Sequence, residues 1–207
     1  MIEIEVARSG ASVLKRDGKF LASTFNPVQE ASAWAKKVHA ALAPEDAAII
    51  AGVGCGYHVA ALKVLRPNCE LLAIENDAGV AAEAFKFCPS LETKNVLVES
   101  DWLKLPDHAR FRDVVCGVYG VAVHGPSLQI DPVYVSAVER LLHGRDKLSF
   151  LVLMKTRPEL LAVLNPEAIG LIDDEAVSIK TLRRLFSTAG SSSRERRLWR
   201  VLEELVL

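Results

Sequence analysis

The architecture follows from one segment, AAIIAGVGCGYHVAALKVLR, residues 47–66. Its first part is a continuous apolar run, which is typical of a strand buried on both faces of a parallel sheet. Three glycines come next, Gly52, Gly54 and Gly56, and they allow the chain to turn sharply. A helical segment then continues up to Pro67, a residue that favours helix termination. This order predicts the first strand–turn–helix unit of a parallel sheet.

The same alternation continues on the C-terminal side of this segment. Four more strands are expected, at CELLAIE (69–75), NVLVES (95–100), DVVCGVYGV (113–121) and LSFLVLM (148–154). Asp77 can cap one intervening helix, and Asp131-Pro132 can begin another that Gly144 ends. The predicted fold class is α/β, a three-layer, Rossmann-like, mostly parallel sheet.

The first 45 residues predict a small β unit followed by a helix. Ile2, Ile4 and Val6 alternate with glutamates, the period of a half-buried strand. SVLKR and KFLAST flank Asp17-Gly18, which favours a tight hairpin turn. A helix should begin after Asn26, because Asn26 can cap, Pro27 suits the first helical position and Gln29 completes a capping box. Its apolar face is expected at Ala31, Trp34, Val38 and Leu42.

The last 50 residues predict a helical tail. One helix is expected after Asp173-Asp174, and another after the short break AGSSS at 189–193. The last helix has apolar residues on more than one side, which favours packing on the core or on a second subunit as a homodimer. Three domains are therefore expected: a hairpin with a capping helix (1–45), a nucleoside-binding core (46–156) and a helical tail (157–207).

Composition excludes several classes of protein. The 207 residues carry 25 basic and 26 acidic side chains, so net charge gives no case for nucleic-acid binding. The apolar runs are far shorter than a membrane helix, and the N-terminus does not resemble a signal peptide. Four cysteines, Cys55, Cys69, Cys88 and Cys116, lack zinc or disulfide spacing and are expected to be reduced core thiols. We expect a cytoplasmic protein without a metal.

The glycine turn carries the functional signal. A dinucleotide fingerprint, G-x-G-x-x-G, would place glycine at position 57, where this chain has Tyr57. Glu75 follows 19 residues after Gly56, at a strand end where a carboxylate can bind both ribose hydroxyls of S-adenosylmethionine or of NAD. The observed G-x-G-x-G resembles the turn of S-adenosylmethionine-dependent methyltransferases.

That resemblance implies roles for further residues. The turn, with Tyr57 and His58 after it, would contact the cofactor; His58 alternatively covers the loop. Asp101 after the third strand would contact the adenine amino group, and Trp102 would lie against the adenine face. After the fourth strand, Tyr119 and His124 are candidate catalytic residues, with His124 a candidate base; both alternatively are ordinary loop residues.

A second resemblance covers residues 2–145. FLASTFNPVQEASAWAKKV (20–38), IIAGVGCGYHVAAL (49–62), LLAIENDAGVAAEAF (71–85) and the His124 to Tyr134 stretch resemble the N-terminal and Rossmann-like region of motility accessory factor proteins. That family is associated with flagellin glycosylation and is related to archaeal 6-hydroxymethylpterin diphosphokinases. The resemblance implies a ligand that is a nucleotide or a nucleotide sugar. Because members of that family are usually much longer than 207 residues, we do not expect this chain to carry their sugar-transfer activity.

The leading hypothesis is an S-adenosylmethionine-binding, methyltransferase-like protein of unknown substrate, with a small-molecule or nucleoside-type ligand as its expected partner. One alternative is a short relative of the motility accessory factors or pterin diphosphokinases. The other is a non-enzymatic module whose glycine turn serves packing alone.

Overall fold

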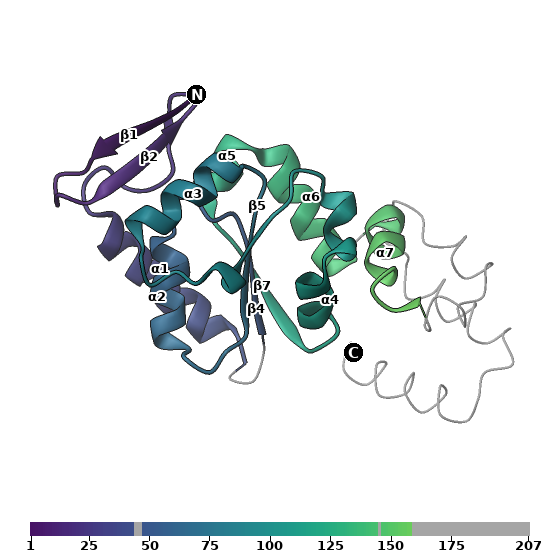
Figure 1. Ribbon diagram of the computed structural model, residues 1–207. Helices are drawn as coiled ribbons and strands as arrows, with labels where there is room; N and C mark the ends of the chain where they lie inside the picture. Colours follow the sequence, from purple (N-terminus) through teal and green to yellow (C-terminus); the bar gives the residue numbers. More distant parts are fainter. Residues whose placement is uncertain (44–46, 145, 159–207) are drawn as a thin grey trace, which may run out of the picture. The chain divides into compact units, whose positions relative to one another are not determined.

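The computed structural model describes residues 1–43, 47–144 and 146–158 (Figure 1). The chain divides into two compact units, Met1–Leu161 and Ala162–Leu207. All described residues belong to the first unit. The predicted C-terminal helices, including the expected dimer helix, lie outside the described residues.

A four-stranded parallel sheet forms the centre of this unit. Strand β4 (Ala47–Ala51) pairs with β5 (Leu71–Glu75) on one side and with β7 (Tyr119–Val123) on the other. Strand β6 (Val96–Val98) pairs with the outer edge of β5, which gives the order β6-β5-β4-β7. The order reverses between β4 and β7, as it does in Rossmann-like sheets. The predicted fold class is confirmed.

Both faces of the sheet are buried under helices. Along β4, Ile49 packs into one core and its neighbour Ile50 into the other, and both are fully buried. Figure 1 shows the helices in two outer layers that flank β4, β5 and β7. One layer holds α1 (Pro27–Ala41), α2 (Tyr57–Leu65) and α3 (Ala78–Phe87); the other holds α4 (Ala109–Val115) and α6 (Pro132–His143).

The N-terminal segment forms its own antiparallel sheet. Strands β1 (Ile2–Val6), β2 (Ser12–Arg16) and β3 (Lys19–Phe20) pair in that order. The predicted turn is confirmed, since Asp17 and Gly18 both have positive φ, 51° and 79°. The expected half-buried face of β1 is wrong: Ile4 and Val6 are 54% and 73% exposed. Alternation defines two faces of a strand, but β1 is an edge strand and β2 takes the core position.

The expected helix caps are confirmed. Asn26 Oδ1 accepts a hydrogen bond from Gln29 N at 3.1 Å, and Asp77 Oδ1 accepts from Gly79 N at 2.8 Å. Helix α6 begins after Asp131, which accepts from Tyr134 N, and ends at Gly144 with φ 58°.

Two strand predictions are wrong. Residues 148–154 lie in helix α7 (Lys147–Met154), which begins at a strong cap: Asp146 accepts from Ser149 N and from Ser149 Oγ, both at 2.8 Å. A short apolar run does not distinguish a buried strand from a buried helix, and here the cap and the packing select the helix. The predicted strand at 113–121 begins only at Tyr119, because Asp113–Val115 ends helix α4.

The connecting segments complete the description of the fold. They contain η1 (Thr93–Asn95), η2 (Trp102–Asp107) and the short helix α5 (Gly125–Ile130). The cysteines are free thiols, as expected, and three are buried, but Cys116 is exposed because it follows the end of α4 at the surface. Among the described helices, none has the length and apolar content that crossing a membrane requires.

Candidate functional site

The glycine turn lies between β4 and α2 at the carboxyl edge of the sheet. Gly52 and Gly54 both have positive φ, 98° and 49°, which only glycine adopts without strain. A Cβ on Gly52 would collide with Ser127, and a Cβ on Gly54 would lie 2.6 Å from His124 Cε1. The turn therefore needs glycine because the segment that begins α5 packs directly on its backbone. Gly56, also at positive φ, packs against Ala84 and Leu91.

Glu75, the last residue of β5, is bonded to this turn. Its Oε2 accepts from Val53 N at 2.9 Å and from Gly54 N at 3.3 Å. Its Oε1 accepts from Asn76 N at 3.1 Å and from Asp77 N at 3.3 Å. Burial raises the pKa of the Glu75 carboxyl above its ordinary value, and the four N–H groups oppose that rise. The carboxylate thus ties two strand ends together through the backbone.

A crevice opens beside Glu75, and we call it the glutamate crevice. It is lined by residues from the N-terminal sheet, both strand ends and helices α3, α5 and α6: Arg16, Leu21, Gly52, Ile74, Glu75, Asn76, Val80, Ser127, Ile130, Asp131, Tyr134 and Val135. It lies near the carboxyl ends of the strands, where open α/β sheets bind their ligands. The free space inside it is only about 10 Å³.

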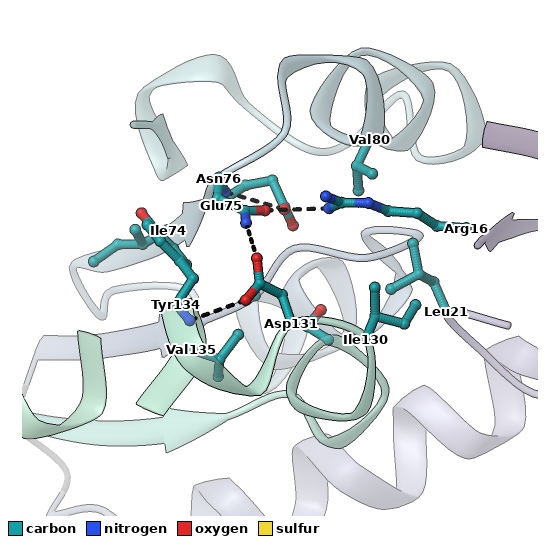
Figure 2. Close-up of a pocket in the computed structure, with 12 residues that line it drawn as sticks. Arg16, Leu21, Ile74, Glu75, Asn76, Val80, Ile130, Asp131, Tyr134 and Val135 are labelled. Atoms are coloured by element: carbon teal, nitrogen blue, oxygen red, sulfur yellow. Dashed lines mark hydrogen bonds between the residues drawn. The ribbon is translucent and has the colours of Figure 1, made fainter. Parts of the chain in front are cut away.

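Polar contacts close this crevice. Figure 2 shows the Asn76 side chain reaching Asp131 from across the crevice, where Asn76 Nδ2 donates to Asp131 Oδ2 at 2.6 Å. On the opposite side, Arg16 Nη1 donates to Asn76 Oδ1 at 3.3 Å and lies 3.5 Å from Asp77 Oδ2. These contacts connect β2, the end of β5 and the start of α6 across the crevice. We call this set of contacts the latch.

A second space lies beside the same turn, and we call it the histidine cavity. It measures about 60 Å³ and is lined by Leu21, Ala22, Pro27, Glu30, Ala31, Trp34, Cys55, Tyr57, His58, His124 and Pro126. The rings of His58 and His124 stack in parallel, with centroids 3.9 Å apart. The Trp34 ring meets His58 edge-on at 4.9 Å.

Hydrogen bonds fix the two imidazoles. His58 Nε2 lies 3.1 Å from Gly52 O, and since a carbonyl only accepts, Nε2 carries the proton. His124 Nδ1 lies 2.8 Å from Ser127 Oγ. Both side chains are buried, and burial lowers the pKa of His58 to about 4 and the pKa of His124 well below its ordinary value. Both rings are therefore neutral at pH 7.

The other sequence candidates are dispersed. Tyr57 lines the histidine cavity, and its OH donates to Ser12 O at 2.8 Å. Tyr119 begins β7 opposite Ala47, at the far edge of the sheet from the turn, and its OH donates to Leu142 O. Asp101 accepts from Leu103 N, and Trp102 packs on the core. Of these residues, only Tyr57 lies beside the glycine turn.

Sequence reasoning missed several residues that line the two spaces. Asn76 and Ser127 have signals that were available, because Asn76 directly follows Glu75 and Ser127 lies one helical turn after His124. Arg16 was read only as part of a hairpin strand, and Trp34 only as part of a helix face. Neither has a local signal, because each reaches the site through tertiary packing.

Within the described part of the chain, no three His, Cys, Asp or Glu side chains are grouped to hold a metal ion. No model of a known protein family matches the chain, and no curated protein matches it. The chain is similar to one solved structure, MnmC2 from Aquifex aeolicus, with 13% identity and a TM-score of 0.36. The match covers 64% of this chain and 52% of that one, so the chain spans about half of its length.

The similarity to MnmC2 is too low to carry a functional argument, and the resemblance to motility accessory factors stays a prediction. The fold assignment depends instead on strand order and layering. By these criteria the chain is a Rossmann-like α/β protein with an added N-terminal antiparallel sheet.

Proposed function

We propose that the protein binds S-adenosylmethionine in the glutamate crevice and is methyltransferase-like. One observation carries this proposal: a glycine turn, the acid that ends the next strand and the N-terminus of α6 meet in one crevice at the carboxyl edge of the sheet. In open α/β sheets this edge is the usual ligand site.

Charge favours this ligand over a nucleotide. Two carboxylates, Glu75 and Asp131, line the crevice with one guanidinium, Arg16. S-adenosylmethionine carries a sulfonium, an ammonium and a carboxylate, so its net charge is positive. The phosphates of a nucleotide would meet the same two acids at close range. Arg16 is the one feature that favours a nucleotide, and it is already beside Asp77.

Binding requires the crevice to open. A free space of about 10 Å³ holds about one water molecule. Release of the Asn76–Asp131 bond would let the start of α6 move away from β5 and would make room beside Glu75. Glu75 could then exchange part of its backbone bonding for ribose hydroxyls.

Isothermal titration calorimetry tests the proposal. The protein is titrated with S-adenosylhomocysteine, and separately with CMP and with ATP, each with and without Mg²⁺. We expect micromolar binding of S-adenosylhomocysteine and, at 100 times its dissociation constant, about 2.7 kcal/mol of added stability. Binding of CMP or ATP alone would favour the nucleotide alternative. No binding by any ligand would leave the turn as a packing element.

A matched pair of variants tests the part of the proposed site that would bind the adenine of S-adenosylmethionine. Asp101→Ala removes the acid after β6, and Asp107→Ala removes an exposed acid six residues later. We expect weaker S-adenosylhomocysteine binding in Asp101→Ala alone, because the methyltransferase resemblance assigns the adenine amino group to this position. Equal affinities would remove Asp101 from the proposed site. A cytoplasmic location stays part of this proposal.

A further inference from the structure

The histidine cavity has polar groups that the fold itself does not use. Because His58 Nε2 donates to Gly52 O, the other nitrogen of the neutral ring, Nδ1, carries a lone pair. Among the described residues Nδ1 has no hydrogen-bond partner, and neighbouring atoms do not seal it. Because His58 lines the cavity, we take Nδ1 as the ring nitrogen that is open to it. A buried acceptor of this kind is rarely left unpaired unless a ligand or water completes it.

The only formal charge among the residues that line the histidine cavity is negative. Glu30 is the one charged side chain among the lining residues, since both imidazoles are neutral and the rest are apolar, aromatic or thiol groups. Glu30 Oε2 accepts from Ser23 N at 2.7 Å, which fixes the carboxylate at the start of α1. The Trp34 and Tyr57 rings add aromatic surface, which attracts cations.

The size of the cavity limits the ligand. One water molecule needs about 10–15 Å³ on the scale by which this cavity measures about 60 Å³. The space therefore holds about four to six water molecules, which is the size of a short alkyl group with one polar end. A nucleoside is far larger and does not fit.

We infer that the histidine cavity is a binding site for a small primary alkylammonium group, with His58 Nδ1 accepting one N–H and Glu30 balancing the charge. The site is separate from the glutamate crevice, although Leu21 lines both. An amine-bearing metabolite, or the amine end of a longer molecule, has this chemistry.

Three small molecules, each with five non-hydrogen atoms, serve as probes of the inference: n-butylammonium, tetramethylammonium and n-butanol. Tetramethylammonium has the charge without an N–H, and n-butanol has the shape without the charge. Long-range ¹H–¹⁵N NMR spectra report each ring nitrogen of His58 separately. We expect n-butylammonium to shift the Nδ1 resonance saturably, with a dissociation constant in the millimolar range. We expect at least tenfold weaker effects from the other two probes.

Variants at the surface of the cavity sharpen the test. Glu30→Gln keeps an acceptor for Ser23 N and removes the charge, so it should weaken n-butylammonium binding at least fivefold. Glu30→Asp should retain much of the affinity. Glu92→Gln, an exposed acid outside the cavity, is the matched control and should change nothing.

Several outcomes would overturn the inference. They are an unshifted Nδ1 resonance at 100 mM n-butylammonium, equal binding of tetramethylammonium or n-butanol, and unchanged affinity in Glu30→Gln. The spectral dispersion of each variant shows whether it is folded. The readout is the His58 ring, which does not line the glutamate crevice, so failure here leaves the proposed function standing.

Discussion

The glutamate crevice and the histidine cavity flank the same glycine turn but differ in how their polar groups are satisfied. In the crevice, Glu75 accepts four backbone N–H groups, and Asn76 bonds across to Asp131. In the cavity, His58 uses one ring nitrogen and leaves the other toward open space. The glutamate crevice, at the usual ligand position of an open α/β sheet, is thus closed by its own residues. The histidine cavity beside it is open.

This comparison has a physical reason. A buried carboxylate is costly unless several donors surround it, so Glu75 at a strand end recruits the nearest free N–H groups, which belong to the turn. A neutral imidazole costs much less to bury than a carboxylate, so His58 needs fewer hydrogen-bond partners from the fold than Glu75 does. The fold therefore uses all the hydrogen-bonding capacity of Glu75 in the crevice, and only part of that of His58 in the cavity.

The largest effect is expected from Glu75→Gln. The amide replaces one acceptor oxygen with an NH₂ group that faces backbone N–H donors, so two buried donors lose their partner. We expect a loss of about 3 kcal/mol or more in the free energy of unfolding, measured by urea denaturation. Asp107→Ala, the exposed control, should leave the midpoint unchanged. A stable Glu75→Gln would mean that the crevice is not tied to folding.

The second prediction concerns pH and the histidine cavity. The pKa of His58 is lowered to about 4, whereas the unfolded chain has the ordinary value near 6.5, so the unfolded state binds more protons between these values. Stability should therefore fall as the pH decreases through this window, by about 2 kcal/mol from His58 between pH 7 and pH 5. His124 acts in the same direction.

Urea denaturation at pH 7 and pH 5 measures this effect, with His58→Phe as the comparison. The variant should lose about 2 kcal/mol less than the parent over the same interval. Glu75 opposes the trend, since its pKa is raised and the folded state gains from its protonation, but it does so in both proteins. Parallel pH profiles would show that His58 is not buried as a neutral ring.

A third prediction separates backbone strain from collision at the turn. Gly54→Ala and Gly10→Ala both place alanine at positive φ, but only Gly54 faces a neighbouring side chain, the His124 ring. We expect Gly54→Ala to be the more destabilising by about 1–2 kcal/mol in urea denaturation. Equal losses would mean that the His124 ring moves aside freely and that the turn is not packed against α5.

The smallest effect is expected from the latch. Asn76→Ala removes the bonds to Arg16 and Asp131 and should cost about 1 kcal/mol of stability. The same change should strengthen S-adenosylhomocysteine binding in calorimetry, because opening the crevice no longer breaks these bonds. Asn68→Ala, in an exposed loop, is the control. An unchanged or weaker affinity would contradict the role of Asn76 as a latch.

The comparison also shows how far the candidate site could be predicted. Glu75 was identified from its distance to the glycine turn, and its position at the end of β5 agrees. Its partners were not identified, because they depend on which strand ends lie side by side. The strand predicted at 113–121 puts Tyr119 near its carboxyl end, but the structure starts that strand six residues later, so Tyr119 lies at the opposite edge.

By itself, the sequence determined the features that depend on a few neighbouring residues. Asn26, Asp77 and Asp131 cap their helices, Asp17-Gly18 turns the hairpin, and the apolar run of β4 marks a doubly buried strand. Each depends on hydrogen bonds or backbone angles within about four residues, so the local sequence contains the full cause.

Only the tertiary structure decided which apolar runs became strands and which polar groups met. The apolar pattern of residues 148–154 suits a strand or a helix equally well until packing against the core selects one. The stacking of His58 on His124 and the latch from Arg16 through Asn76 to Asp131 join residues 55 to 66 positions apart in the chain. Such contacts arise from packing between elements, and no local pattern encodes them.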